Sequence, residues 1–533
     1  MSMKRKIIGS LLTGMLILPG AVYAAQGTQI TELAVTMSAA ADSGQKAEQK
    51  VYSLSFNPKN YTRQTLSYNG KTVAFRAYEN IPYVARPVAV DRQSMNIYIP
   101  EAYFQKDGII NGYTAKTAPI FLPNGVGGYM PGDSKVPSEK DRMSGGANAS
   151  LVALSKGYVV AAPAIRGRTT QNENGVYVGK APALIVDYKA AVRYLRHNKK
   201  QLPAGDTDKI ISNGTSAGGA LSVLLGATGN SKDYEPYLQA LGAAKERDDI
   251  FAASVYCPIT NLEHADMAYE WMFNGVNEAY QQTGRMMPTL SSQETVTDRP
   301  ADAPTETQQA TKMTWEQQVA STALKKQFPA YVNSLKLEDR KGNRLWLDGA
   351  GNGPFATYIK SVYLKSVQSA LDQGADLDGA DWFTVKDGKA VDMNFAKYAA
   401  WATRLKATPA FDKFDLSSGE NDEFGDSANT PKHFTAFSAL RDTSRGASAD
   451  PAVIRMLNPM DYIGARGVKT AKYWRIRHGA KDRDTCLAIP AMVALKLQNS
   501  RKKVDFAAPW GYGHAGDYDL DALFAWMDGI CKK

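Results

Sequence analysis

Short runs of hydrophobic residues recur through the first half of the chain and again near its end, each with the length of a β-strand. These runs lie at residues 72–78, 95–100, 118–122, 158–162, 208–213, 252–257, 472–476 and 504–508. Residues 183–196 instead carry apolar side chains every three or four positions, which is the period of an amphipathic helix. Strands that alternate with helices predict a mostly parallel sheet flanked by helices on both faces.

The alternation stops after residue 260 and resumes near residue 465. The chain between these points is richer in polar and helical segments, and it contains no visible repeat. A stretch of about 200 residues is long enough for a domain of its own. We therefore expect residues 261–464 to form an inserted cap, or lid, domain. The main domain would then consist of residues 25–260 and 465–533.

Gly214, Ser216 and Gly218 form the pattern G-x-S-x-G, between a predicted strand and an apolar segment typical of a buried helix. A strand, a sharp turn and a helix are the context of the nucleophile elbow of α/β-hydrolases. The glycines let the backbone turn without a Cβ clash, which lifts the serine hydroxyl above the sheet. Because chance alone often produces this short pattern in a long chain, the prediction depends on finding partners for the serine.

In an α/β-hydrolase the partners of the serine follow it in the order acid, histidine, each after a late strand. Asp482 comes just after the seventh hydrophobic run, and His514 comes just after the last one. An imidazole so placed takes the hydroxyl proton, and the carboxylate fixes its tautomer. Of the five histidines, only His514 has the right order and place. Asp484 competes with Asp482, which we favour because it is nearer to the strand.

An oxyanion hole needs two backbone N–H donors. One is expected from Ala217, the residue after the nucleophile. The other is expected from the glycine-rich loop at residues 123–129, where Gly127 and Gly128 are equally good candidates. With these features in matching order, the sequence predicts an α/β-hydrolase fold with a mostly parallel central sheet and a large inserted cap domain.

The charge of the chain argues against nucleic acid as a partner. The formal net charge is +10 over 533 residues, and the 63 basic residues are spread along the sequence. No basic block with interleaved aromatic residues is present, so we expect a solvated charged surface and no nucleic-acid binding.

Residues 1–24 have the pattern of a secretory signal peptide. A basic segment at 4–6 precedes an apolar segment at 7–22, which is short for a membrane span, and small residues favour cleavage after Ala24. The next residues, 26–49, are polar and predict a loose extension. We expect an exported protein, periplasmic or secreted, that has no membrane contact after cleavage. An uncleaved membrane anchor is the alternative.

The chain contains only three cysteines. Cys257 lies in an apolar run and is expected to be a buried strand residue. Cys486 and Cys531 could pair in an oxidising compartment, but the sequence leaves this open. No spacing of cysteine and histidine indicates a zinc site, and we expect neither a metal nor another cofactor.

Several longer strings are similar to those of the bacterial tannases of the Lactobacillus type, which are tannin acylhydrolases. They lie at residues 124–130, 165–170, 213–219, 257–271, 409–412, 474–479 and 514–519. The resemblance covers nearly all of the chain after the leader, including the cap. It implies a serine esterase that cleaves gallate and protocatechuate esters through an acyl-enzyme intermediate, with Ser216, Asp482 and His514 as its triad.

The resemblance also implies a site that binds the hydroxyl groups of the galloyl ring. Its members are matched by Lys406, Glu420 and Asp484. A galloyl ring carries three adjacent hydroxyls, each of which both donates and accepts hydrogen bonds. Two carboxylates and an ammonium group are suitable partners for them. The expected substrate is a galloyl ester or a hydrolysable tannin.

Other functions share this scaffold. A feruloyl esterase or a general carboxylesterase is the nearest alternative, and a peptidase would use the same triad. A binding protein without catalytic activity is a further class, against which the intact triad argues. Hydrolysis of methyl gallate, methyl ferulate and p-nitrophenyl butyrate would distinguish these functions.

Overall fold

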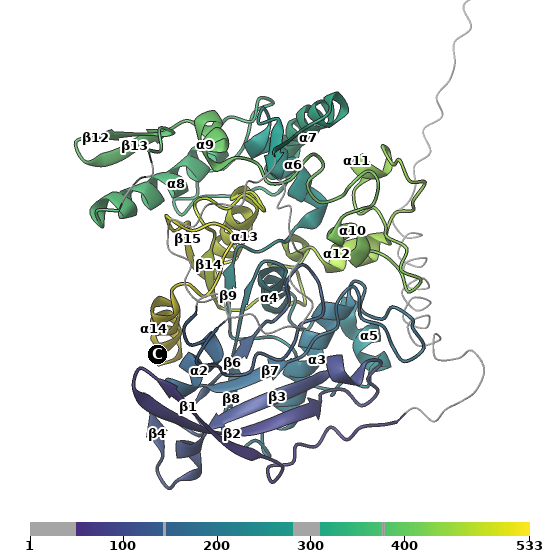
Figure 1. Cartoon of the computed structure of the whole chain (residues 1–533), viewed down its shortest axis with the longest axis vertical. Helices are drawn as coiled ribbons and strands as arrows, with labels where there is room; N and C mark the ends of the chain where they lie inside the picture. The colour runs from purple at the N-terminus through teal and green to yellow at the C-terminus, as the bar shows by residue number, and fades with distance from the viewer. Residues whose placement is uncertain (1–49, 142–144, 281–309, 376, 378, 533) are drawn as a thin grey trace, which may run out of the picture.

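The structure is a computed structural model that describes residues 50–141, 145–280, 310–375, 377 and 379–532 (Figure 1). The expected signal peptide, residues 1–24, and the expected polar extension, residues 26–49, lie outside the described residues. Among the described helices, none is both long enough and apolar enough to cross a bilayer.

Nine of the described strands form one sheet. In spatial order they are β1 (Thr62–Tyr68), β2 (Lys71–Pro82), β3 (Ser94–Pro100), β7 (Val159–Pro163), β6 (Pro119–Pro123), β8 (Asp206–Thr215), β9 (Ala252–Tyr256), β14 (Tyr473–Arg477) and β15 (Lys503–Ala507). The pairs from β1 to β7 are antiparallel, and all pairs from β7 to β15 are parallel. The mostly parallel sheet predicted from the sequence is therefore confirmed.

Strand β1 is the one strand of this sheet that the hydrophobic pattern does not reveal. Its sequence, TRQTLSY, is largely polar, and alternate side chains are exposed because it lies at the sheet edge. A two-residue turn at Asn69 and Gly70, both with positive φ, joins it to β2. Such turns match the natural twist of a hairpin, so the turn chemistry identifies the strand better than its hydrophobicity does.

Helices flank the sheet in two groups. α3 (Ala183–His197) packs on α4 (Ala217–Ala227) and α5 (Glu235–Ala240), while α2 (Ala149–Ser155) packs on β7 and on α14 (Leu520–Cys531). α13 (Ala488–Asn499) packs on β15. Phe524 of α14 lies 5.6 Å from Phe121 of β6, measured between ring centroids, so α14 packs on the sheet through an aromatic contact.

Helix α3 is buried more completely than its amphipathic pattern predicts. Every residue of the helix except His197 is buried, including four charged side chains. The Lys189 ammonium pairs with Asp248 at 2.9 Å, and neither side chain is exposed. Arg193 binds the same carboxylate at 2.8 Å. The polar face of α3 is therefore neutralised by ion pairs with other segments instead of facing solvent.

The described part of the chain between β9 and β14 adds no strand to the main sheet. Its elements are α6 (Leu262–Phe273), β10 (Glu278–Tyr280), β11 (Ala310–Lys312), α7 (Trp315–Ser334), α8 (Pro354–Asp372), β12 (Phe383–Lys386), β13 (Lys389–Met393), α9 (Phe395–Ala402), α10 (Gly419–Glu423), α11 (Ala436–Ala439) and α12 (Pro451–Met456). The four strands form two separate two-stranded sheets. Most of this segment stands above the C-terminal strands in Figure 1, as a cap would.

The cap contains a cluster of aromatic rings that is continuous with the core of the main sheet. Trp271 of α6 contacts Phe328, Phe355 and Phe395, which come from α7, α8 and α9. The last part of the cap is joined to the main domain by an ion pair of the Arg455 guanidinium in α12 with Asp233 at 2.6 Å. The boundary at residue 464 stays a prediction.

The three cysteines are all buried and free. The open question of a bridge between Cys486 and Cys531 is thereby answered: the bridge does not form. The Cys486 sulfur instead accepts a hydrogen bond from the Ala488 N–H at the start of α13, whereas Cys531 lies at the end of α14. Cys257, expected within a strand, lies one residue beyond β9 with a φ of +44°.

A buried ion pair fixes the segment that follows β7. Asp187 of α3 accepts bonds from Arg166 Nε at 2.8 Å and Nη2 at 2.7 Å, and from Gln93 at 3.0 Å. Asp187→Asn should lower the free energy of unfolding by about 3–5 kcal/mol, because it leaves the Arg166 charge buried without a counter-charge. Denaturant unfolding measures this loss. Asp381→Asn, which removes a solvent-exposed pair with Lys397, is the control and should leave the midpoint unchanged. Equal midpoints for both variants would contradict the argument.

Candidate active site

Ser216 occupies a sharp turn between β8 and α4, with φ +59° and ψ −125°. L-residues other than glycine rarely adopt this conformation, and a surrounding structure must hold it. The Ser216 N–H donates to the Tyr256 carbonyl at 3.0 Å, and the Ser216 carbonyl accepts from the Ile259 N–H at 3.2 Å. The neighbouring strand and the chain after it therefore maintain the strained turn predicted from G-x-S-x-G.

The glycines of the motif permit close approach to the loop after β6. A Cβ on Gly218 would lie 2.7 Å from the Val126 carbonyl oxygen and 2.9 Å from Asn124 Oδ1. A Cβ on Gly214 would lie 2.5 Å from the Gly218 carbonyl oxygen. Neither position has room for a side chain, so the start of α4 packs directly on the glycine-rich loop.

That loop turns tightly beside the elbow. The Met130 N–H donates to the Gly127 carbonyl at 2.9 Å, and both residues between them, Gly128 and Tyr129, have positive φ. The buried Tyr129 hydroxyl donates to the Ile259 carbonyl at 2.7 Å and anchors the turn. Within the described part of the chain, the N–H groups of Gly127 and Gly128 donate to no other group. Gly127 and Gly128 thus both stay candidates for one oxyanion donor, and the Ala217 N–H at the start of α4 is the candidate for the other.

Asp482 and His514 lie together beyond the ends of β14 and β15. The two residues approach to 3.0 Å, between His514 Nδ1 and Asp482 Oδ2. Asp484 Oδ2 is 3.9 Å from the same nitrogen and half-exposed, while the Asp482 side chain has no exposed surface. The structure therefore pairs the histidine with Asp482, as the sequence argument favoured.

The loop that carries His514 rests on the nucleophile elbow. A Cβ on Gly516 would lie 1.8 Å from Oγ1 of Thr215, the residue before Ser216. Asn213 of β8 donates to Asp517 at 2.8 Å. These contacts place the histidine loop against the serine turn at the C-terminal edge of the parallel strands, where open α/β sheets carry their sites.

The charges of this pair shift both pKa values. Burial disfavours the ionised Asp482 carboxyl, but the His514 imidazole beside it outweighs burial and holds the pKa of Asp482 well below its usual range. Burial also lowers the pKa of His514, and the charge and hydrogen bond of Asp482 outweigh that effect and raise it above 6.5. The arrangement yields a permanent carboxylate and a more basic imidazole, which suits general base catalysis.

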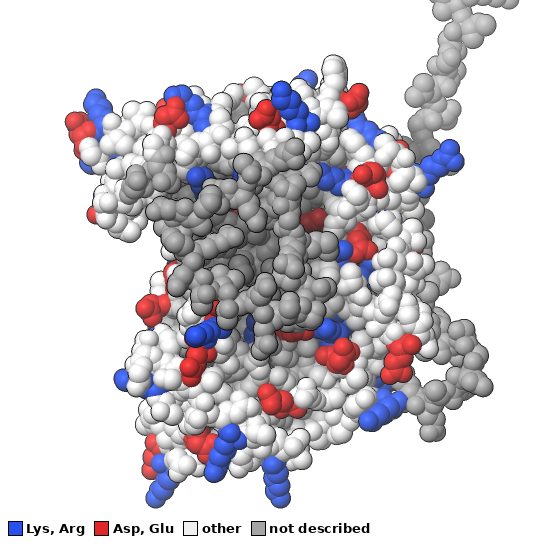
Figure 2. All heavy atoms as spheres, in the orientation of Figure 1, with Lys and Arg blue, Asp and Glu red and all other residues white. Residues whose placement is uncertain are grey.

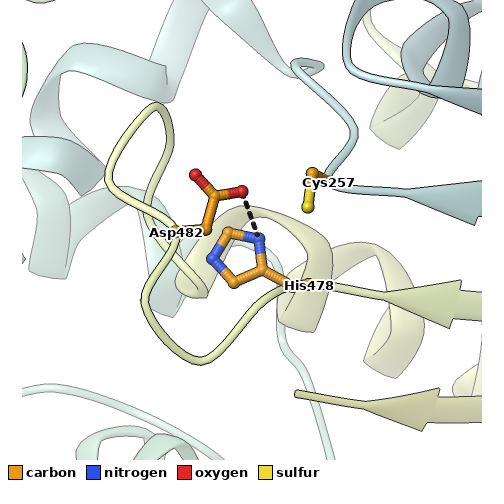
Figure 3. A group of neighbouring side chains, drawn as sticks. All are labelled: Cys257, His478 and Asp482. Atoms are coloured by element: carbon orange, nitrogen blue, oxygen red, sulfur yellow. Dashed lines mark ion pairs between the residues drawn. The ribbon is translucent and has the colours of Figure 1, made fainter. Parts of the chain in front are cut away.

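Two further side chains pack against the Asp482 carboxylate (Figure 3). His478 Nδ1 lies 3.5 Å from Asp482 Oδ2. Burial lowers the pKa of His478, so this contact joins a neutral imidazole and a carboxylate. The Cys257 sulfur lies 3.5 Å from the Ala515 carbonyl oxygen, at the base of the histidine loop. The sequence argument expected Cys257 to be a buried strand residue and found only His514 in the place of the catalytic histidine, so it gave His478 no role beside the acid.

These side chains also form the groups that most resemble a metal site among the described residues. One is Cys257, His478 and Asp482, and the other is Asp482, Asp484 and His514, each with ligand atoms within 4.8 Å of one another. Both groups share the Asp482 carboxylate, which already binds the His514 imidazole. Burial raises the pKa of the Cys257 thiol, so it stays protonated and is a poor ligand. The expected absence of a metal stays a prediction.

Two of the three expected ring-binding residues lie beside this centre. The Lys406 ammonium donates to the Asp484 carbonyl at 3.0 Å and lies 4.2 Å from the Phe411 ring centroid. Glu420 comes from α10, and no hydrogen bond or ion pair within the described residues joins it to Lys406 or Asp484. The structure thus brings Lys406 and Asp484 together and places Glu420 on a separate helix of the cap.

Comparisons with known proteins identify the family of this chain. The chain is similar to the tannase of Fusobacterium nucleatum at 51% identity, over 90% of this chain and 100% of that one, with a TM-score of 0.83. It is similar to the tannase of Lactobacillus plantarum in its orthorhombic crystal at 45% identity, over 90% and 100% of the two chains, with a TM-score of 0.83. The chain belongs to the bacterial tannase family.

This protein is therefore a carboxylic-ester hydrolase with an α/β-hydrolase fold. The family model BD-FAE, which describes α/β-hydrolases, matches residues 125–296. A tannin acyl hydrolase solved with ethyl gallate is 44% identical over 90% of this chain and 99% of that one, with a TM-score of 0.82. A search of curated protein sequences gives no match.

The two charged neighbours of His514 should move its titration in opposite directions. The Asp484 charge raises the pKa of His514 and the Lys406 charge lowers it. In the pH profile of kcat/KM for p-nitrophenyl acetate, Asp484→Asn should therefore move the acidic limb to lower pH, and Lys406→Met should move it to higher pH. If the acidic limb moves in the same direction in both variants, its assignment to His514 is contradicted. Lys502→Met, which changes a partly exposed lysine outside the site, is the control and should not move the limb.

Proposed function

We propose that this tannase hydrolyses galloyl esters with Ser216 as nucleophile, His514 as general base and acid, and Asp482 as the carboxylate that orients the histidine. The observation that carries the proposal is the 3.0 Å contact of His514 and Asp482 on a loop seated against the serine turn. Serine esterases need this arrangement, because a serine hydroxyl is a weak nucleophile until a base removes its proton.

The reaction proceeds in two balanced halves. Ser216 Oγ attacks the ester carbonyl while His514 Nε2 takes its proton, and the carbon becomes tetrahedral. The C–O bond to the alcohol then breaks, and the same nitrogen returns the proton to the leaving oxygen. Water repeats the sequence on the acyl-enzyme and releases the free acid. Asp482 stays ionised throughout and stabilises the imidazolium.

The oxyanion of each tetrahedral intermediate would bind the Ala217 N–H at the start of α4 and one N–H of the loop after β6. Gly127 and Gly128 both offer an N–H for this role. Donors fixed before the reaction lower the barrier without reorganisation, and one such donor contributes on the order of a hundred- to a thousandfold in kcat.

The acid part of the ester would lie between the cap and the sheet, with its ring hydroxyls on Lys406, Glu420 and Asp484. Solved tannin acyl hydrolases in this family carry ethyl gallate and 3,4-dihydroxybenzoate, which share adjacent ring hydroxyls. A site of charged groups rejects esters without hydroxyls, because its polar groups would then stay unpaired. This is the feature that separates a galloyl esterase from a general carboxylesterase on the same scaffold.

We further propose that the substrate reaches an exported enzyme as a small diffusing ester. The proposal of export rests on the leader at residues 1–24. On the face shown in Figure 2, basic and acidic side chains are intermixed, as expected for a protein whose partner is a small molecule.

Ser216→Ala should fold normally and lose nearly all hydrolysis. Removing a triad nucleophile lowers turnover by roughly a million-fold and leaves the contribution of binding and of the oxyanion hole. The measurement is kcat for methyl gallate, with circular dichroism as the control for folding. Turnover within tenfold of the parent would show that another group is the nucleophile.

Lys406→Ala and Glu420→Ala should each lower kcat/KM for methyl gallate by roughly ten- to a hundredfold, since each removes a hydrogen bond to a charged group. The kcat/KM for methyl benzoate, which has no ring hydroxyls for these residues to bind, should change little. The decisive quantity is the ratio of kcat/KM for the two esters, compared with that of Lys432→Ala, a cap lysine paired with Asp426. An unchanged ratio in both variants would reduce the proposal to a general esterase, and a higher activity on methyl ferulate would favour a feruloyl esterase.

A further inference from the structure

The string IRGRTT, residues 165–170, has no part in the reaction described above, yet it is held firmly in place. Arg166 is locked by Asp187, and the Thr170 hydroxyl accepts from the Gly167 N–H at 2.9 Å. A Cβ on Gly167 would lie 2.2 Å from the backbone of Met130 and Pro131. The segment therefore packs directly on the end of the glycine-rich loop, with Arg168 between its two fixed ends.

Arg168 contacts the oxyanion loop and the cap at the same time. Its backbone N–H donates to the Tyr129 carbonyl at 2.9 Å, and its Nε donates to the Gly128 carbonyl at 3.1 Å. Its Nη1 donates to Asp422 of α10 at 2.5 Å. The guanidinium also covers Gly419, where a Cβ would lie 3.4 Å from it. One side chain thus joins the turn of Gly127 and Gly128 to the helix of Glu420.

The bridge is built to be stiff. The side chains of Arg168 and Asp422 are only 16% and 19% exposed, so solvent screens their pairing weakly. Lys180 binds the other oxygen of the Asp422 carboxylate and also Asn429 at 2.8 Å. The Ala181 N–H donates to the Glu423 carbonyl at 2.9 Å. The main domain therefore holds α10 at Asp422 and Glu423, directly after Glu420.

We propose that Arg168 is a positioning residue that sets the separation between the oxyanion donors and the ring-binding carboxylate of Glu420. The proposal rests on the proposed function. A substrate held by its ring hydroxyls reacts only if its carbonyl reaches the donors at the same time, and a misplacement of about 1 Å can cost on the order of a hundredfold in rate. A planar guanidinium can bind both partners in one geometry, whereas a lysine ammonium is a point charge.

The test is a double-mutant cycle with Arg168→Lys and Glu420→Ala. Arg168→Lys should lower kcat for methyl gallate by roughly ten- to a hundredfold, with a smaller change in KM. It should lower kcat for p-nitrophenyl acetate less, since that ester has no ring hydroxyls to align. In the Glu420→Ala background the additional loss on methyl gallate should disappear, because no carboxylate remains to be positioned.

Thr169→Ala is the matched control, since Thr169 is the exposed neighbour in the same segment and should leave both esters unchanged. Thermal unfolding of every variant separates a loss of fold from a loss of alignment. A loss on methyl gallate that persists in full without Glu420 overturns the coupling alone, and so does full activity of Arg168→Lys. If Glu420→Ala alone leaves the ratio of kcat/KM for methyl gallate and methyl benzoate unchanged, Glu420 does not bind the ring. That result overturns both the ring-binding assignment and the role of Arg168 in positioning Glu420.

Discussion

A carboxylate without exposed surface must be compensated by its neighbours, and the candidate active site is organised around one such group, Asp482. One oxygen accepts the Asp484 N–H at 2.9 Å, and the other faces two imidazoles, those of His514 and His478. Because His478 is kept neutral by burial, the carboxylate charge is left for His514. The raised pKa of His514 follows chiefly from this one buried charge, and a hydrogen bond to the same carboxylate fixes the backbone of Asp484.

The second organising feature is the division of the proposed substrate site between two parts of the chain. The groups proposed to act on the carbonyl come from the main sheet and its loops, and the groups proposed to bind the ring include residues of the inserted segment. Charged contacts cross between the parts at Lys406 with Asp484 and at Arg168 with Asp422. Interactions with a remote, unreacting ring accelerate the reaction only when they are aligned with the reacting atoms. In the proposed function, these contacts between the two parts would supply this alignment.

Particular elements show where sequence patterns succeed and where they fail. The hydrophobic runs predict eight of the nine strands of the main sheet. The pattern is clearest for β6, β7 and β9, which are buried along their whole length because both faces are covered. Strand β1 is missed because an edge strand can be polar. The apolar period of α3 correctly predicts a helix, but it also suggests a polar face exposed to solvent. That face is buried in the structure, because the charges of Lys189 and Arg193 are paired with Asp248. The sequence left open whether Cys486 and Cys531 form a disulfide. In the structure both are free, with Cys486 just before α13 and Cys531 at the end of α14.

By itself, the sequence determined the order of strands and helices, the serine turn, the place of the acid and the histidine after late strands, and the resemblance to tannases. These features depend on spacing within a few residues or on chain order. Only the tertiary structure decided that His514 pairs with Asp482 at 3.0 Å and not with Asp484 at 3.9 Å. It also revealed His478 and Cys257 around the acid, and the contact of Arg168 with Asp422 across 254 positions. Such contacts join residues that are far apart in the sequence. Separation along the chain does not predict separation in space, so only the packed structure shows that these residues meet.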